Sequence, residues 1–498
     1  MQGRLRGCEM STFLSKSKYL LGLQCPKYLW IAIHEKEKIP EVDQATQHRF
    51  DQGHLVGELA KKWFPKGIDI DQEDFKKNIE ETKELISKRK ILFEAGILAD
   101  NIYSRADVLK PVGKDEWDII EVKSSTEVKD VNIHDVSFQK HCYEKFGLKI
   151  RKCFLMFINN KYVRKGDVDP KELFKIEDIT LQVDEVSEGI KERIEDMFKI
   201  IGMKKCPDVK LTKDCFKPYP CPIEECWSFL PKNNVFSLYR GGKKGFELYD
   251  DGIYSIKDIP LDFKLTSNQQ IQKDCTISKK AYVDKEKIKS FLDTLKFPLY
   301  FLDFETYCTA IPLYDNLSPY QQIPFQFSLH ILEDINSKPK HHSFLAEGDK
   351  DPRMDFLVSL KKVIGKKGDI LVYNKAFENR IMNELSRAFP KNNWIESVTD
   401  RFVDLLIPFR KFYYYNSKQE GSASIKDVLP ALTGKSYVDL EIAGGESASL
   451  QYLYITHGAT DGTMATEKET AEIRKNLEKY CKLDTEGMIW IVEKLRGL

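Results

Sequence analysis

Two short hydrophobic runs that end in charged residues are the most informative pattern in this chain. The run 117–120 leads directly into Glu121 and Lys123, and a second run leads into Asp303 and Glu305. Runs of this length and apolar content are typical of buried strands. Because residues two apart on a strand point to the same face, each run predicts a strand that presents two charged side chains together.

Helical spacing of apolar residues predicts several helices around these strands. One helix is expected over 13–31 and another over 50–60. Two more are expected to contain Gln139–Tyr143 and, near the end of the chain, Tyr480–Asp484. The two ends of each of these five-residue segments are one helical turn apart, so their side chains share a face.

Alternating apolar and polar positions predict further strands after Asp303. The stretches 325–331 and 341–345 are expected to lie antiparallel to the strand that ends at Asp303, and 369–374 is expected to be another strand. Strands and helices thus intermingle along the whole chain. This order predicts a mixed α/β protein.

Asp107, Glu121 and Lys123 form the first candidate active site. Two carboxylates can hold a divalent metal, and a nearby lysine can orient or activate water. The order Asp, then Glu-x-Lys, then a helix with Gln139 and Tyr143 resembles the restriction-endonuclease-like nucleases, and its Q-x-x-x-Y element resembles their RecB branch. The alternative is that Glu121 and Lys123 are a surface pair on an edge strand.

One element of that resemblance departs from the family. RecB-like nucleases usually carry a metal-binding histidine on an early helix, and Gly57 occupies the matching position here. His54 and Glu58, which share a face of the same helix, are candidate replacements as metal ligands. A surface histidine without a ligand role is the alternative.

Cysteines form a second candidate cofactor site. Cys215, Cys221 and Cys226 are clustered, and Cys25 lies far upstream. Four thiolates can bind zinc or an iron–sulfur cluster, but the C-x-x-C pairs typical of zinc sites are absent. Cys206 is a lower-ranked competitor, and four unrelated buried thiols are the alternative.

One cysteine before a nuclease core and three after it resembles the iron–sulfur nucleases of the AddB and CRISPR-adaptation RecB type. The resemblance implies a [4Fe–4S] cluster on Cys25, Cys215, Cys221 and Cys226 that joins the two ends of the domain. With eleven cysteines, no secretory signal and no membrane-spanning run, the sequence predicts a reducing, cytoplasmic location and no membrane partner.

The C-terminal acids form a second candidate active site. The motifs D-x-E, N-x-x-F-E and Y-x-x-x-D resemble those of the DnaQ-like 3′→5′ exonucleases with an RNase-H fold. They supply five candidate catalytic residues, of which the four acids would bind two Mg²⁺ or Mn²⁺ ions: Asp303, Glu305, Glu378, Tyr480 and Asp484. The family usually has Asp at the position of Glu378, and Asp404 is a possible alternative ligand. A degenerate, inactive exonuclease fold is the alternative.

These resemblances imply an α/β fold in three parts. We expect a restriction-endonuclease-like (PD-(D/E)xK) RecB-like domain with an iron–sulfur cluster over 10–230, a connecting module over 231–285, and a DnaQ-like, RNase-H-like domain over 286–498. The order as a whole resembles uncharacterised prokaryotic fused nucleases. At 498 residues the chain is long enough for two or three domains.

The expected function is metal-dependent hydrolysis of nucleic acid, with DNA favoured, in repair, recombination or defence against foreign DNA. The net charge is only +1, so phosphate contacts must come from local basic groups. Two alternatives remain: a nucleic-acid-binding scaffold with one or both sites degenerate, and RNA as substrate of the C-terminal domain.

Overall fold

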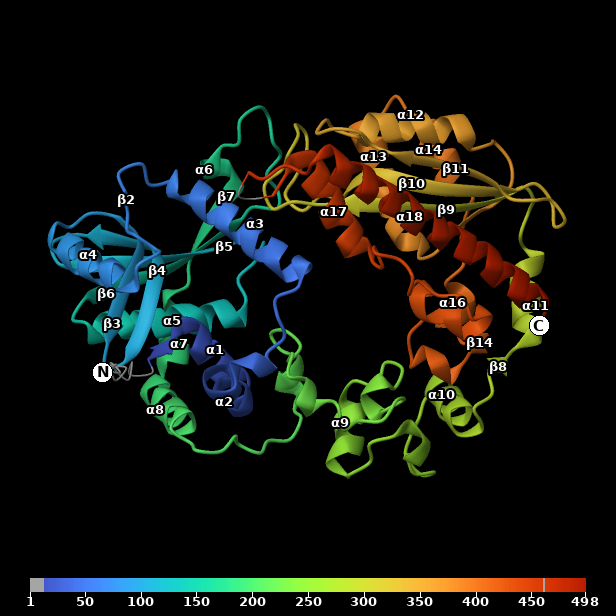
Figure 1. The fold of residues 1–498 in the computed structure, drawn as a ribbon. Coiled ribbons are helices and arrows are strands. Elements are labelled where there is room, and N and C mark those ends of the chain that lie inside the picture. The colour runs from blue at the N-terminus through green and yellow to red at the C-terminus, as the bar shows by residue number, and fades with distance from the viewer. Residues whose placement is uncertain (1–12, 460–461) are drawn as a thin grey trace, which may run out of the picture. The chain divides into compact units, whose positions relative to one another are not determined.

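The computed structural model describes residues 13–459 and 462–498, which form two compact units of mixed α/β structure (Figure 1). The first unit extends to Trp227 and includes the segment Thr309–Tyr320; the second comprises Ser228–Cys308 and Gln321–Leu498. Residues 10–12, with which the predicted N-terminal domain begins, lie outside the described residues.

The first unit is built on a mixed sheet with the order β2-β3-β4-β5-β6-β7, and β1 pairs with β4. The β3–β4, β4–β5 and β6–β7 pairs are antiparallel, whereas β5 and β6 are parallel and connected through a helix, α5. The strands are β1 (Leu14–Ser15), β2 (Ile68–Asp69), β3 (Leu92–Ala99), β4 (Ile102–Val112), β5 (Glu116–Lys123), β6 (Lys149–Ile158) and β7 (Phe174–Asp178).

Helices cover both faces of this sheet. They are α1 (Lys16–Gln24), α2 (Pro26–His34), α3 (Gln44–Lys61), α4 (Phe75–Ser87), α5 (Asp130–Lys145), α6 (Pro170–Leu173), α7 (Thr180–Ser187) and α8 (Ile190–Ile201). Residues of α1, α5, α7 and α8 share one hydrophobic core, and α3 packs with residues of the opposite face (Figure 1). Short 3₁₀ turns occur at Lys36–Lys38, Lys213–Phe216 and Glu224–Cys226.

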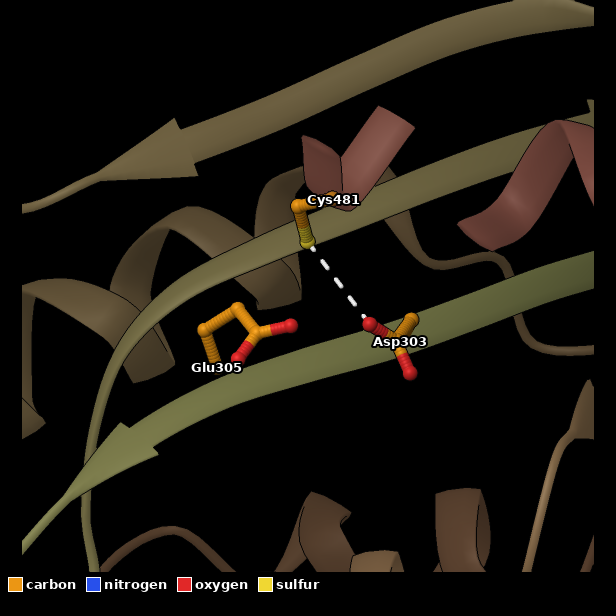
Figure 2. Close-up of side chains that lie close together, drawn as sticks. All are labelled: Asp303, Glu305 and Cys481. Carbon is orange, nitrogen blue, oxygen red and sulfur yellow. Dashed lines mark hydrogen bonds between the residues drawn. The ribbon is translucent and has the colours of Figure 1, made fainter. Parts of the chain in front are cut away.

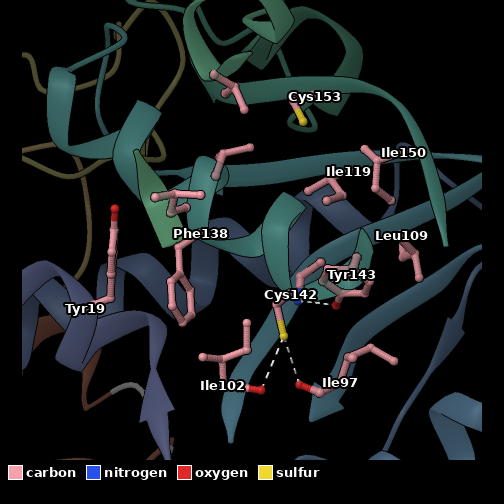
Figure 3. Close-up of a cluster of buried hydrophobic side chains, with 14 of the residues drawn as sticks. Tyr19, Ile97, Ile102, Leu109, Ile119, Phe138, Cys142, Tyr143, Ile150 and Cys153 are labelled. Carbon is pink, nitrogen blue, oxygen red and sulfur yellow. Dashed lines mark hydrogen bonds between the residues drawn. The ribbon is translucent and has the colours of Figure 1, made fainter. Parts of the chain in front are cut away.

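The core on the α5 face is dominated by aliphatic and aromatic side chains (Figure 3). Tyr19 of α1 stacks on Phe138 of α5, with their ring centroids 4.7 Å apart. The Cys142 thiol of α5 donates to the carbonyl oxygens of Ile97 and Ile102, at 3.5 and 3.4 Å. This packing fixes α5 against β3 and β4 and so fixes the direction in which its polar residues point.

The helix predicted over 13–31 is wrong in its extent. Two helices, α1 and α2, meet at Cys25, which has extended backbone angles (φ −163°, ψ 126°). Pro26 causes the break, because a proline disfavours helical geometry in the residue before it and lacks the N–H that would continue the helix. Cys25 is therefore held at a junction between two helices.

The second unit contains a five-stranded sheet with the order β11-β10-β9-β12-β13. β10 is antiparallel to β9 and β11, while β12 is parallel to β9 and β13. The predicted antiparallel arrangement is confirmed for β9 and β10, but β11 pairs with β10 rather than with β9. The strands are β9 (Leu299–Tyr307), β10 (Ile323–Leu332), β11 (Lys340–Leu345), β12 (Ile370–Val372) and β13 (Phe402–Asp404).

The two faces of this sheet differ because side chains alternate along β9. Tyr300, Leu302 and Phe304 enter a hydrophobic core with residues of α12, α13 and α14. The opposite face, which carries Asp303 and Glu305, contacts α18. The helices are α11 (Lys285–Asp293), α12 (Arg353–Val363), α13 (Lys375–Ala388), α14 (Trp394–Thr399), α15 (Ile407–Arg410), α16 (Ile425–Thr433), α17 (Gly445–His457) and α18 (Glu467–Arg496).

The segment 231–285, predicted as a connecting module, packs within the second unit. Cys275 of this segment shares a small hydrophobic cluster with Phe412 and Tyr415, and Tyr239 packs against the same cluster. The regular elements here are α9 (Lys243–Asp250), α10 (Ser267–Ser278) and a two-stranded sheet of β8 (Tyr282–Val283) and β14 (Tyr414–Tyr415), with 3₁₀ turns at Val235–Ser237, Ile256–Asp258 and Ser417–Gln419.

The segment Thr309–Tyr320 groups with the first unit because it packs beside α3. Ala310 belongs to the same core cluster as Val56 and Ala60 of α3. The Gln52 side-chain oxygen accepts from the Ala310 backbone N–H at 3.1 Å. Within the described residues, no helix is long and apolar enough to cross a lipid bilayer.

We predict that Leu302→Ala destabilises the second unit by about 2–5 kcal/mol, because it leaves a cavity in a packed core. Leu302 is fully buried, whereas Leu261 of the same unit is 98% exposed. The matched control Leu261→Ala should change the free energy of unfolding by less than about 0.5 kcal/mol. Denaturant unfolding of both variants measures the difference, and equal effects would contradict the packing described here.

Candidate functional site

Three predicted residues of the N-terminal site, Glu121, Lys123 and Gln139, meet in an ion-pair network between β5 and α5. Lys123 Nζ lies 2.6 Å from Glu121 Oε1 and 2.8 Å from Asp135 Oδ2. The Gln139 amide nitrogen donates to Glu121 Oε2 at 2.6 Å and to Asp135 Oδ1 at 3.0 Å. Glu121 and Asp135 are almost fully buried, whereas the Lys123 side chain is about a quarter exposed.

Lys16 of α1 is a second cation in this network. Its Nζ lies 2.7 Å from Glu121 Oε1 and 3.5 Å from Asp135 Oδ1. Burial by itself lowers the pKa of Lys16 and of Lys123, but Asp135 and Glu121 outweigh burial and raise both pKa values. Both lysines are therefore held in the charged form. Neither Lys16 nor Asp135 was found from the sequence, because no motif spacing marks them.

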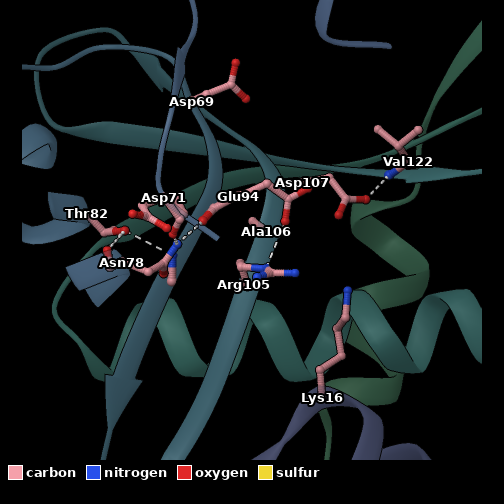
Figure 4. Close-up of polar contacts among 12 residues, drawn as sticks. Lys16, Asp69, Asp71, Asn78, Thr82, Glu94, Arg105, Ala106, Asp107 and Val122 are labelled. Atoms are coloured by element: carbon pink, nitrogen blue, oxygen red, sulfur yellow. Dashed lines mark hydrogen bonds and ion pairs between the residues drawn. The ribbon is translucent and has the colours of Figure 1, made fainter. Parts of the chain in front are cut away.

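Asp107 of β4 lies beside this network. Its Oδ2 accepts a hydrogen bond from the Val122 backbone N–H at 2.6 Å (Figure 4). Burial raises the pKa of Asp107, and the charges of Lys16 and Lys123 oppose that rise. Glu94, another acid that the sequence did not single out, raises the pKa of Asp107 further. Asp107, Glu121 and Lys123 are thus grouped as predicted from their order in the chain.

A cavity of about 370 Å³ lies next to Asp107. Its lining combines the charged side chains of Lys16, Glu94 and Arg105 with the aromatic rings of Phe75 and Tyr103. Arg105 Nε pairs with Glu94 Oε2 at 2.8 Å (Figure 4). Cationic and aromatic side chains together can contact the phosphates and bases of a nucleic acid.

Tyr143 lies one turn after Gln139 but is bonded elsewhere. Its hydroxyl donates to the Ala95 carbonyl oxygen and accepts from the Ala106 N–H at 3.0 Å. It therefore joins β3 to β4 beside Asp107. The structure gives Tyr143 a positioning role through the backbone.

The two candidate replacements for the missing histidine lie on the exposed side of α3. His54 and Glu58 are both exposed, and Glu58 Oε1 pairs with Lys61 Nζ at 2.6 Å. In the described part of the chain, no group of three metal-ligating atoms within 4.8 Å of one another includes either residue. The structure does not bring them together with Asp107 and Glu121 as ligands.

The four cysteines predicted as cluster ligands converge from the two ends of the first unit. Each of the six pairs among Cys25, Cys215, Cys221 and Cys226 interacts electrostatically. The Gln24 amide joins the two ends, donating to the Asp214 and Tyr219 carbonyl oxygens at 3.1 and 2.9 Å.

Burial controls the chemistry of these thiols. It raises the pKa values of Cys25 and Cys221, and raises that of Cys226 to about 11. Without a cation, the side chains of Cys25, Cys221 and Cys226 therefore remain thiols at neutral pH. Cys206 interacts instead with Lys27, Lys38 and two glutamates, and none of the four cysteines is among its main electrostatic partners.

The C-terminal site is a group of acids where β9 meets α18. The side-chain ligand atoms of Asp303, Glu305 and Cys481 all lie within 4.8 Å of one another (Figure 2). Asp484, one turn after Tyr480, is also buried, and its Oδ1 accepts from the Tyr437 hydroxyl at 2.7 Å. The strand and helix periods therefore place Asp303, Glu305 and Asp484 together as the sequence predicted. Cys481 and Tyr437 were missed, because neither fits a motif position.

Glu378 completes this set of acids from the first turn of α13. It is 3% exposed, and its Oε2 has no hydrogen-bond partner. Its charge acts on Asp303. Asp404, the alternative ligand, sits at the end of β13, where its Oδ1 accepts from the Asn374 and Leu406 backbone N–H groups at 3.2 and 3.0 Å. These bonds favour a structural role for Asp404.

Excess negative charge is the main electrostatic property of this site. In the described residues, none of Asp303, Glu305, Glu378 and Asp484 forms an ion pair with a basic side chain. Burial raises the pKa of Asp484 to about 6 and that of Glu378 to about 8, and it raises those of Asp303 and Glu305 well above the ordinary carboxyl range. Lys426 partly opposes the rise for Glu305 and Asp484. Such a site can hold protons or divalent cations.

Comparison with known proteins finds relatives without an assigned activity. The model of a domain of unknown function, DUF2779, matches residues 300–424, which include Asp303, Glu305 and Glu378. An uncharacterised protein of Mycoplasma pneumoniae, the MG366 homolog, is 26% identical over 233 residues, covering 43% of this chain and 34% of that protein. Uncharacterised protein MG366 of Mycoplasma genitalium is 25% identical over 242 residues, covering 44% and 35%. The similarity thus spans about a third of the length of these curated relatives.

The raised carboxyl pKa values generate a pH prediction. The native site retains protons that the unfolded chain releases above pH ~4, so the metal-free protein should lose stability as pH rises from ~4 to about 8. Each retained proton contributes a slope of about 1.4 kcal/mol per pH unit. Mn²⁺ should reduce the loss by replacing the protons.

Denaturant unfolding at pH 5 and pH 8, with and without Mn²⁺, measures this dependence. Glu378→Gln removes one titrating group with little change in shape, so it should flatten the slope of the metal-free protein. Glu286→Gln, on the first turn of α11, is the matched control and should leave the slope unchanged. An identical slope in wild type and Glu378→Gln would refute the raised pKa of Glu378.

Proposed function

We propose that this chain is a metal-dependent nuclease with two active sites, and that DNA is its substrate. The observation that carries the proposal is the C-terminal set of four acids, none of which has an ion-pair partner in the described residues. Glu305, Glu378 and Asp484 are buried, and Asp303 is partly buried. A buried carboxylate without a counter-charge is costly, and divalent cations are the partners that such a set binds. Phosphodiester hydrolysis is a reaction that uses paired divalent ions.

Two divalent ions held by Asp303, Glu305, Glu378 and Asp484 would stabilise the attacking and leaving oxygens of an in-line displacement. The protein contributes the placement of these acids on one face of β9 and on the helices α13 and α18. Tyr480 is buried, and burial and nearby acids raise its pKa, so its hydroxyl remains protonated and can orient water. Lys426, whose Nζ lies 5.4 Å from the Tyr480 ring centroid, adds a nearby positive charge.

The sheet order supports the RNase-H-like, DnaQ-type expectation for this unit. An acid-bearing strand, β9, lies between an antiparallel partner, β10, which the sequence predicted, and a parallel one, β12, whose direction it did not predict. This arrangement favours 3′→5′ exonuclease activity for the second unit. RNA remains the alternative substrate, because the same chemistry acts on both nucleic acids.

The N-terminal network supports a second, restriction-endonuclease-like site of the RecB type. Asp107 and Glu121 would hold one Mg²⁺ or Mn²⁺ ion, and Lys123 would stabilise charge on the transferring phosphate. Both lysines bond to the same oxygen, Glu121 Oε1, so an ion held at that oxygen would take the place of one of the two ammonium groups. That ammonium group would then be available to the phosphate.

The four converging cysteines fit the expected [4Fe–4S] cluster. This set lacks the C-x-x-C pairs typical of zinc sites, which favours a cluster over zinc. Its role would be structural, because Cys25 and the group Cys215–Cys226 lie at opposite ends of the unit's sequence.

A scaffold with degenerate sites is the competing proposal. In the first unit the missing motif histidine favours a degenerate site. In the second unit the replacement of the usual aspartate by Glu378 favours one. The location that suits the enzyme is the cytoplasm, and the processes that suit it are repair, recombination and defence against foreign DNA. Activity measurements separate the two proposals.

We predict that the anaerobically purified protein is brown and that Cys25→Ser or Cys221→Ser removes the colour and destabilises the first unit. Ligand energy contributes to folding in such a closure. Cys206→Ser is the matched control and should keep the cluster. Iron and zinc analysis with visible absorption makes the measurement; one zinc and no iron per chain would contradict the cluster.

We predict that the two activities can be removed separately in the full-length protein. Asp303→Asn should abolish Mn²⁺-dependent release of mononucleotides from a 3′ end, leaving the N-terminal activity. Lys123→Ala should lower the N-terminal cleavage rate by a factor on the order of a hundred or more, because it removes a charge that stabilises the transition state.

End-labelled single-stranded DNA, duplex DNA and RNA serve as substrates with Mg²⁺ or Mn²⁺. Asp293→Asn and Lys140→Ala, which alter exposed ion pairs of the same units, are the matched controls. Full activity of Asp303→Asn at the 3′ end would refute the C-terminal assignment. A folded wild-type protein inert on all three substrates would favour the scaffold.

A further inference from the structure

Cys481 is placed among the acids of the C-terminal site. Its thiol is fully buried and lies 3.8 Å from Asp303 Oδ2 (Figure 2). Its sulfur and one oxygen each from Asp303 and Glu305 lie within 4.8 Å of one another. These three atoms form the one group of three or more potential metal ligands found in the described residues.

Other buried cysteines of this chain have a different environment. Cys142 donates to two backbone carbonyl oxygens within a hydrophobic core, and Cys275 lies near the Tyr415 carbonyl oxygen in a small hydrophobic cluster. Cys481 instead contacts a carboxylate. A thiol beside carboxylates is in a position to act as a metal ligand with them. Packing in a hydrophobic core does not require a carboxylate neighbour, so packing alone does not explain the position of Cys481.

A second observation points to a cation-binding site at the same place. Glu378 is only 3% exposed, and its Oε2 is buried without a hydrogen-bond partner. Its charge acts on Asp303, one of the three grouped ligands. An unpartnered buried oxygen is costly, so it favours an ion that Glu378 and Asp303 can share.

The mixture of ligand atoms selects among metals. Thiolate sulfur binds Zn²⁺ and Cd²⁺ well, whereas Mg²⁺ requires oxygen ligands. Three protein ligands with an open fourth position are a common zinc arrangement. We propose that Asp303, Glu305 and Cys481 form a mixed oxygen–sulfur site for Zn²⁺ or Cd²⁺. The proposal rests on the proposed function in one respect: zinc would occupy the position that Mg²⁺ or Mn²⁺ uses in catalysis.

Binding and regulation follow from this arrangement. The Cys481 thiol loses its proton to solvent when the sulfur–zinc bond forms, so zinc binding strengthens as pH rises. Zinc binds nitrogen, oxygen and sulfur sites more tightly than Mn²⁺. Submillimolar zinc should therefore displace Mn²⁺ from the C-terminal site and inhibit its hydrolysis, so that the 3′ exonuclease responds to the free zinc concentration.

The test compares full-length wild type with Cys481→Ser and with Cys308→Ser, a matched control for a half-buried cysteine of the same unit. Cd²⁺ titration followed by ultraviolet sulfur-to-cadmium charge transfer reports each bound thiolate. The cysteines of the first unit contribute equally to all three proteins and cancel. Wild type and Cys308→Ser should show one more bound thiolate than Cys481→Ser, and Zn²⁺ affinity should fall at least tenfold in Cys481→Ser.

Equal cadmium spectra and equal zinc affinities in the three proteins would overturn the proposal. Cadmium-113 NMR of the wild type needs no variant: a resonance from a mixed oxygen–sulfur set, distinct from all-sulfur cadmium, supports the site, and its absence refutes it. Mn²⁺-dependent hydrolysis is measured in the same preparation. Hydrolysis without the cadmium signal would refute only the zinc site. The cadmium signal without hydrolysis would refute only the proposed function of that unit.

Discussion

The burial of like charges in the second unit governs the chemistry of its candidate site. β9 presents Asp303 and Glu305 to α18 because its alternate residues are committed to the hydrophobic core on the other face. Asp484 and Glu378 are buried at the same place. Folding therefore creates a negative site whose energy is lowered either by protons or by metal ions. Burial of the hydrophobic face of β9 contributes folding free energy that offsets the cost of burying the acids on its polar face.

In the N-terminal site, basic side chains of the protein neutralise the buried acids. Lys16 and Lys123 neutralise Glu121 and Asp135 directly, and the Gln139 amide satisfies the remaining oxygens. The N-terminal network thus contains its own counter-charges, whereas the C-terminal set is not neutralised by ion pairs in the described residues. The two units should therefore differ in how strongly their stability depends on pH and divalent ions.

The local spacing of apolar and polar residues was enough to predict the strands and helices that carry the candidate residues. The apolar runs that end at Glu121 and Asp303 predicted two strands and the face on which each pair of charged residues lies. The four-residue spacing predicted that Tyr480 and Asp484 share a helix face. Sequence spacing could not reveal Lys16 or Cys481, because only tertiary packing brings them to the sites. It also missed the break at Cys25, where Pro26 overrides an apolar helical pattern.

The central claim is that the four C-terminal acids form a divalent-metal site. Anomalous scattering from crystals grown with saturating Mn²⁺ tests it most directly, because manganese can be located without reference to activity. We expect manganese bound between Asp303, Glu305, Glu378 and Asp484, in two positions when a nucleotide is present. Well-ordered carboxylates with no manganese between them at saturating Mn²⁺ would contradict it.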